Sequence, residues 1–137
     1  MKYFKDSPIG LWIVSVSIII FTIYYYIRPF LEGVDVSTVY SPMFEFTLWG
    51  FILWINFILE IISIYAVTYG FYYKKNWARL YTIAFNCLSV FLILQVIFIE
   101  KIEIFERYVW VVFLVLTTMY LMMSHVREYF GIKKLFF

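Results

Sequence analysis

The chain has few of the residues from which active sites and metal sites are usually built. Its single cysteine, Cys87, excludes an internal disulfide and a paired-cysteine redox site, and we expect it to be a small buried apolar residue. Its single histidine, His125, excludes a metal site with several histidines. No glycine-rich phosphate loop, HExxH or GxSxG motif occurs in the sequence. We therefore expect no catalytic residues, no metal, no cofactor and no enzymatic activity.

Charged residues are also scarce, at 15% of the 137 residues, and the net charge of +2 gives no electrostatic argument for a nucleic-acid partner. By contrast, 65% of the residues are hydrophobic and 25% aromatic, whereas a typical globular domain is about 45–50% apolar. So little polar surface cannot cover a compact body of this size in water. The composition therefore excludes an ordinary soluble domain and indicates a membrane protein.

Four stretches poor in charge are long enough to cross a hydrocarbon core, which takes about 20 apolar residues in a helix. They are apolar all round, whereas the strands of a transmembrane barrel alternate apolar and polar residues. The sequence therefore predicts an all-α, polytopic membrane protein, an antiparallel bundle of four transmembrane helices that forms a single domain over residues 1–137. Pro29 disfavours helical geometry at Arg28, so the first helix is expected to end there. The expected helices cover about residues 9–28, 45–73, 78–99 and 107–126.

Lysines and arginines are unevenly distributed between the two ends of these helices. Basic residues that flank short loops are retained in the cytoplasm, so the richer side is expected to be cytoplasmic. We therefore expect a multi-pass protein of the cell membrane with both termini in the cytoplasm. The loops 31–45 and 99–107 are expected to face out. Eight basic residues lie on the cytoplasmic side, namely Lys2, Lys5, Lys74, Lys75, Arg79, Arg127, Lys133 and Lys134, and three on the other, namely Arg28, Lys101 and Arg107.

Three short segments of the chain resemble segments of other membrane proteins. Segment 69–79 reads Tyr-Gly-Phe-Tyr-Tyr-Lys-Lys-Asn-Trp-Ala-Arg, segment 126–131 reads Val-Arg-Glu-Tyr-Phe-Gly, and segment 7–10 reads Ser-Pro-Ile-Gly. Taken in order, they resemble a group of uncharacterised small four-helix membrane proteins of archaea and bacteria. The resemblance implies the four-helix topology and no particular reaction. The long outer loop and the high tyrosine content of this chain depart from the commoner members of the group.

The connection between the second and third helices predicts an interfacial anchor. Trp77 is amphipathic, and Lys74, Lys75 and Arg79 can lie against anionic lipid headgroups, where each cation contributes about 1 kcal/mol. Anchoring at the membrane interface explains these residues without a ligand. The alternative is that they form a specific binding site for a lipid or a partner protein.

Glu60 is the residue of the spans that most needs a specific role, because placing a carboxylate near the bilayer centre costs about 2.5 kcal/mol or more. Asn56, Glu60 and Ser63 follow helical spacing and share one face of the second helix. Matching depths across the hairpin places Asn86 and Gln95 of the third helix opposite them. The sequence thus predicts an intramembrane polar seam, either hydrogen-bonded through a protonated Glu60 or serving as a proton-coupled or cation-binding site.

Two functions remain open from the sequence. The first is a non-enzymatic membrane protein that acts through helix packing, as an accessory or stabilising subunit of a larger complex or as a homo-oligomer. Its partners would be membrane lipids and other transmembrane helices or itself. The alternative is a minimal proton-coupled small-molecule transporter that uses Glu60 and resembles the small multidrug-resistance exporters. In those exporters the glutamate lies in the first helix, and the uneven basic count here argues against the dual topology that some of them use.

Overall fold

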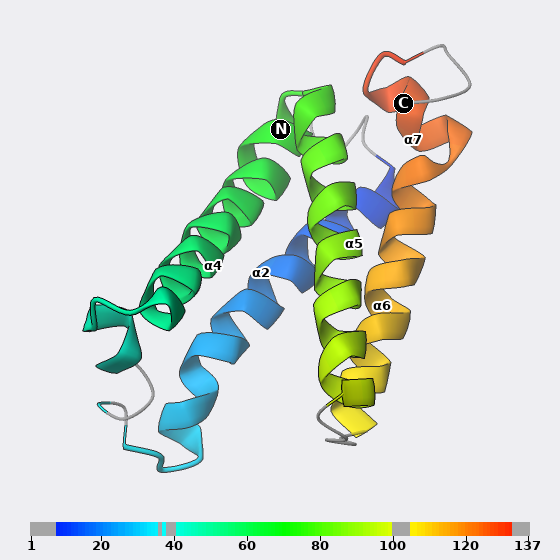
Figure 1. Ribbon diagram of the computed structural model, residues 1–137. Helices are drawn as coiled ribbons and strands as arrows, with labels where there is room; N and C mark the ends of the chain where they lie inside the picture. The colour runs from blue at the N-terminus through cyan, green and yellow to red at the C-terminus, as the bar shows by residue number, and fades with distance from the viewer. Residues whose placement is uncertain (1–7, 36, 38–40, 100–104, 133–137) are drawn as a thin grey trace.

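The computed structural model describes residues 8–35, 37, 41–99 and 105–132, and no strand occurs among them (Figure 1). Each of the four helical spans is long and apolar enough to cross a membrane, which confirms the expected all-α, four-helix membrane class. Three short elements accompany the long helices: η1 (Ser41–Phe44), the π-helical turn η2 (Ala66–Gly70) and α7 (Ser124–Tyr129). The long helices are α2 (Ile9–Leu31), α4 (Leu48–Tyr65), α5 (Asn76–Ile99) and α6 (Phe105–Met122).

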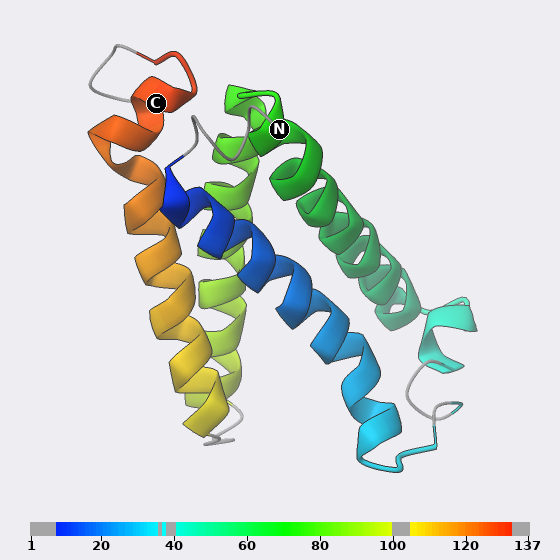
Figure 2. The same ribbon diagram turned by 180° about the vertical axis from the view of Figure 1, so that it is seen from behind.

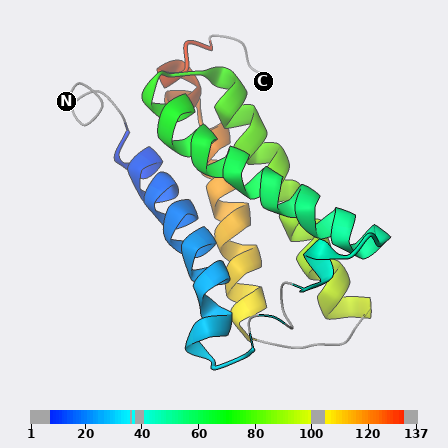
Figure 3. The same cartoon turned by 90° about the vertical axis from the view of Figure 1, so that its left-hand side faces the viewer.

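The long helices are packed tightly at one end of the molecule and spread apart at the other. The start of α2, the connection between α4 and α5, and α7 lie together at the packed end (Figure 1). From there α4 leans away from α5 and α6, as the view from behind also shows (Figure 2). A quarter turn shows α2 and α4 separating toward the same open end (Figure 3). The helices therefore form a bundle that opens toward the end formed by η1 and the start of α6.

The buried apolar core lies at the packed end. Leu11 of α2, Phe71 of the α4–α5 connection and Leu121 of α6 are each 0% exposed. Isoleucines, valines and phenylalanines elsewhere on the four helices are largely exposed, which suits helices with lipid as their solvent. The complete buried cluster consists of Leu11, Val14, Ala66, Val67, Phe71, Ala78, Ile83, Leu121, Val126 and Phe130.

The first and fourth helices end differently from the sequence prediction. The first continues through Pro29 to Leu31, and its last turn stays closed because the amide of Glu32 donates to the Arg28 carbonyl at 3.0 Å. The fourth was expected to reach about residue 126, but α6 ends at Met122. Met123 is extended, with φ −62° and ψ 148°, and the chain turns there into α7.

Several residues used to predict the orientation lie outside the described part of the chain. They include most of the basic residues near the two termini and one in the second outer loop, so the expected cytoplasmic position of the termini stays a prediction. The residues concerned are Lys2, Lys5, Lys101, Lys133 and Lys134.

Candidate functional site: an intramembrane cavity at Glu60

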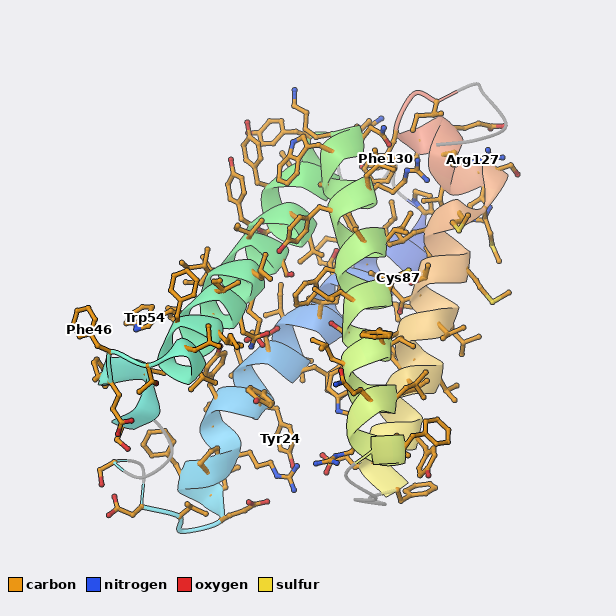
Figure 4. The ribbon with its side chains drawn as sticks, viewed as in Figure 1. Tyr24, Phe46, Trp54, Cys87, Arg127 and Phe130 are labelled. Atoms are coloured by element: carbon orange, nitrogen blue, oxygen red, sulfur yellow. The ribbon has the colours of Figure 1, made fainter. Side chains whose placement is uncertain are left out.

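A cavity of about 360 Å³ lies between the long helices, and all four of them line it. It extends from Ser63 and Thr82, toward the packed end, to Arg28 and Glu106 at the open end. Tyr24, which belongs to the α2 wall, lies between α2 and the α5–α6 pair (Figure 4). The spreading of α2 and α4 from α5 and α6 therefore leaves a hollow at membrane depth rather than a packed core.

Glu60 projects into this cavity from α4. Its Oε1 atom accepts a hydrogen bond from the Asn56 amide at 3.0 Å. The Oε2 atom is buried and has no hydrogen-bond partner among the described residues. A buried carboxylate oxygen without a donor is costly, so the side chains of the described residues leave the site incomplete.

Other polar groups line or border the cavity. Asn86 of α5, 1% exposed, donates from its amide to the Thr118 hydroxyl of α6 at 3.3 Å. The hydroxyls of Ser63 in α4 and Thr82 in α5 bond to carbonyls one turn back in their own helices, at 3.1 and 2.8 Å. These groups make the cavity wall polar, but none of them donates to Glu60.

Four of the five residues of the expected polar seam line the cavity: Asn56, Glu60, Ser63 and Asn86. Gln95 does not, because its side chain is exposed on the outer surface of α5. Nine residues separate Gln95 from Asn86, which turns it to the opposite face of the helix, at about 100° per residue. Cys87 is likewise exposed rather than buried, which corrects the sequence prediction (Figure 4).

Aromatic side chains form much of the remaining wall. Phe21 of α2 packs against Trp110 and Phe113 of α6, with ring centroids 3.9 and 5.3 Å apart. Phe85 of α5 and two tyrosines of α2 add further rings. Aromatic faces attract cations as well as apolar groups, so this wall suits a ligand that combines both.

An ion-pair cluster lies at the open end of the cavity. Arg28 donates from Nε to Glu32 at 2.6 Å and from Nη1 to Glu106 of α6 at 3.0 Å. The Arg28–Glu106 pair links α2 to α6, while the two carboxylates offset the positive charge of the arginine. The sequence analysis used Arg28 for orientation and as the expected end of the first helix. It missed the pair with Glu106, because no spacing along the chain relates residues 28 and 106.

Among the described residues, no group of three histidine, cysteine or acidic side chains is placed to hold a metal ion. Comparison of the chain with protein families, with curated proteins and with solved structures gives no match. The chemistry of the site must therefore be argued from its own residues.

The structure places the residues of the expected interfacial anchor in two different environments. Lys74, Lys75 and Trp77 are exposed at the packed end, where Trp77 stacks on Tyr65 with ring centroids 6.0 Å apart. Arg79 is only 1% exposed, so its expected contact with lipid headgroups from the surface is wrong. Its spacing to residues 82 and 86 puts Arg79 on the buried polar face of α5, a signal that could have predicted its burial.

Proposed function

We propose that this chain is a non-enzymatic membrane transporter that binds a small organic cation in the cavity at Glu60 and exchanges it for protons. The observation that carries the proposal is that Glu60 lines the cavity while its buried Oε2 atom has no hydrogen-bond partner among the described residues. A cationic ligand, or a proton, would supply what the carboxylate lacks. Ionisable residues within the membrane commonly mark such pathways.

The size and lining of the cavity favour a small ligand with apolar and cationic parts. A volume of about 360 Å³ lies at the lower end of the range for small-molecule sites, about 300–1,000 Å³. Aromatic rings such as Phe21 and Trp110 would contact the apolar part and contribute cation–π attraction. Arg28 would not repel the ligand strongly, because Glu32 and Glu106 offset its charge.

Coupling to protons would follow from competition for a single group. The ionised Glu60 would hold the cation, and a protonated Glu60 would release it. Binding should therefore weaken as the pH falls, and protons that cross the membrane down their gradient would drive the cation in the opposite direction, against its own gradient.

The test uses binding and transport of tetraphenylphosphonium, a permanently charged aromatic cation. We expect Glu60→Gln, which keeps a hydrogen-bonding side chain of the same size, to fold normally and to lose binding by calorimetry and proton-driven exchange in proteoliposomes. Glu128→Gln, which removes an exposed carboxylate outside the cavity, is the matched control and should behave like the unmodified protein. Equal binding by Glu60→Gln and the unmodified protein would overturn the proposal.

A role in helix packing is the second candidate, and the outer surface of the bundle favours it. Only 17–28% of the residues in the four spans are buried, so most of each span is available to lipid or to other helices. An accessory subunit or a homo-oligomer would use this surface. Purification in mild detergent followed by mass determination distinguishes the two candidates, because a packing subunit should elute with a partner or as an oligomer whatever residue stands at position 60.

A further inference from the structure

A second cavity, of about 310 Å³, lies between α2 and α4 at the open end of the bundle. Its lining comes from the last turns of α2, from α4, and from Val34 and Met43 of the connection between these two helices. The backbone at Met43 is attached to α4, because the indole N–H of Trp54 donates to the Met43 carbonyl at 2.7 Å (Figure 4). The short helix η1 therefore forms a wall of this cavity that is held to α4.

The second cavity adjoins the Glu60 cavity. Tyr25, Arg28 and Asn56 line both of them. Asn56 is also the residue whose amide donates to the Glu60 carboxyl group at 3.0 Å. A ligand that passes Asn56 from the second cavity therefore reaches the carboxyl group of Glu60, which lies one helical turn farther along α4.

The two cavities suit the same kind of ligand. Their volumes, about 310 and 360 Å³, are similar. Tyr25, Tyr26 and Phe57 give the second cavity an aromatic lining, and the rings of Tyr26 and Phe57 meet edge to face with centroids 5.8 Å apart. Glu32 adds a carboxylate whose side chain is 49% exposed. Aromatic faces beside a carboxylate attract an organic cation, as the lining of the Glu60 cavity does.

The distribution of charge favours the approach of a cation from the open end. Residues 28–45, which connect the last turn of α2 to the start of α4, include three acidic residues and one basic residue. At the packed end, by contrast, Lys74 and Lys75 are exposed. Surface charge of one sign raises the local concentration of ligands of the opposite sign. A cation is therefore concentrated at the end of the molecule that holds the second cavity.

An ion pair crosses the other path from the open end into the Glu60 cavity, between α2 and α6. Arg28 Nη1 lies 3.0 Å from Glu106 Oε2 and joins these two helices. Among the described residues, no ion pair joins α2 to α4. Side-chain rotation at Tyr25 and Asn56 could thus connect the two cavities while the ion pair stays intact.

We propose that the second cavity is the entry site through which a small organic cation passes between the open end and Glu60. The cation is held first by the aromatic rings and by Glu32, and it then passes Asn56 to reach the Glu60 carboxylate. This inference rests on the function proposed above, because it concerns access to the same carboxyl group.

The experiment fills the second cavity and measures binding of tetraphenylphosphonium to the full chain in dodecyl maltoside by stopped-flow tryptophan fluorescence. In a Cys87→Ser background, Leu53→Cys is labelled with N-benzylmaleimide, because Leu53 lines the second cavity and not the Glu60 cavity. We expect the label to slow association and dissociation by about tenfold or more and to change the equilibrium affinity by less than about twofold. The matched control is labelled Ile52→Cys, at an exposed neighbouring position outside both cavities, which should keep the rates of the unlabelled protein.

A second variant covers the case in which Leu53→Cys does not fold. Val34→Cys lines the same cavity from outside the helices, and its label should slow both rates in the same way. Unchanged rates with retained affinity would overturn the entry site and leave the Glu60 site standing, and equal slowing in labelled Ile52→Cys would also overturn it. Failure of the proposed function shows before any labelling, as equal binding by Glu60→Gln and the unmodified protein, and it would overturn both proposals.

Discussion

Gly70 and Ala78 lie so close together that a methyl group on Gly70 would overlap the Cβ atom of Ala78. Gly70 ends the π-helical turn η2 and Ala78 lies in the first turn of α5, so this contact is where the hairpin between the two helices closes. Both residues are buried. Small side chains at this one point let α4 and α5 approach at the packed end, although they separate farther along.

Replacing Gly70 with alanine should therefore destabilise the protein. The added methyl group must displace the start of α5, and overpacking of this kind costs about 1–3 kcal/mol. The measurement is the melting temperature in detergent. The double variant Gly70→Ala with Ala78→Gly removes the overlap and should recover most of the loss; no recovery would show that the contact with Ala78 is not the cause.

Removing the Tyr81 hydroxyl should loosen the attachment of α4 to α5. Tyr81 donates to the Leu59 carbonyl at 2.5 Å, a contact between the two helices beyond the hairpin. Tyr81→Phe should lower stability by about 0.6 kcal/mol, the average for hydrogen bonds between transmembrane helices. Tyr108→Phe, at an exposed position, is the control and should have no effect. An equal loss in both variants would contradict this role of Tyr81.

The hydrogen bond between Asn56 and Glu60 should appear as a coupling energy. In a double-mutant cycle of Asn56→Ala and Glu60→Leu, scored by denaturation in detergent, we expect a coupling of about 0.5–1.5 kcal/mol. The matched cycle of Ser63→Ala and Glu60→Leu should give a coupling near zero, because the Ser63 hydroxyl bonds to Leu59. Similar couplings in the two cycles would mean that Glu60 senses its whole helix face rather than Asn56.

Chemical labelling tests the membrane topology. Cys87 is exposed in the middle of α5, so in a bilayer it should face lipid and resist a charged, membrane-impermeant maleimide until the protein is denatured. In a Cys87→Ser background, Ser37→Cys should be labelled in intact cells and Ser124→Cys only after lysis. The reverse pattern would show that the termini face out.

The number and type of helices followed from the sequence, but the direction in which individual side chains point did not. Long apolar stretches fix the number of spans, and the spacing of Asn56, Glu60 and Ser63 put them correctly on one face. Gln95 was misplaced because matching depth across a hairpin ignores rotation about the helix axis. Asn86 and Gln95 each match the depth of a polar residue of the second helix, but they lie on opposite faces of α5.

The environment of the arginines depended on contacts between distant parts of the chain. Interfacial charge predicted a headgroup contact for Arg79, yet the Leu121 carbonyl lies 42 residues away and becomes available only because α6 ends at Met122. The extended Met123 that ends α6 had no proline or glycine to signal it. Likewise, the pairing of Arg28 with Glu106 depends on how α2 and α6 approach each other, which one sequence does not reveal.

The unequal lengths of α5 and α6 matter for the bilayer in which the protein works. Helices of 24 and 18 residues are about 36 and 27 Å long, and the hydrocarbon core of a typical bilayer is about 30 Å thick. The two helices lie side by side, so no single thickness matches both (Figure 1). A thin membrane suits α6 and makes α5 tilt, whereas a thick one buries the polar ends of α6. Bilayer thickness thus acts on the angle between two walls of the Glu60 cavity.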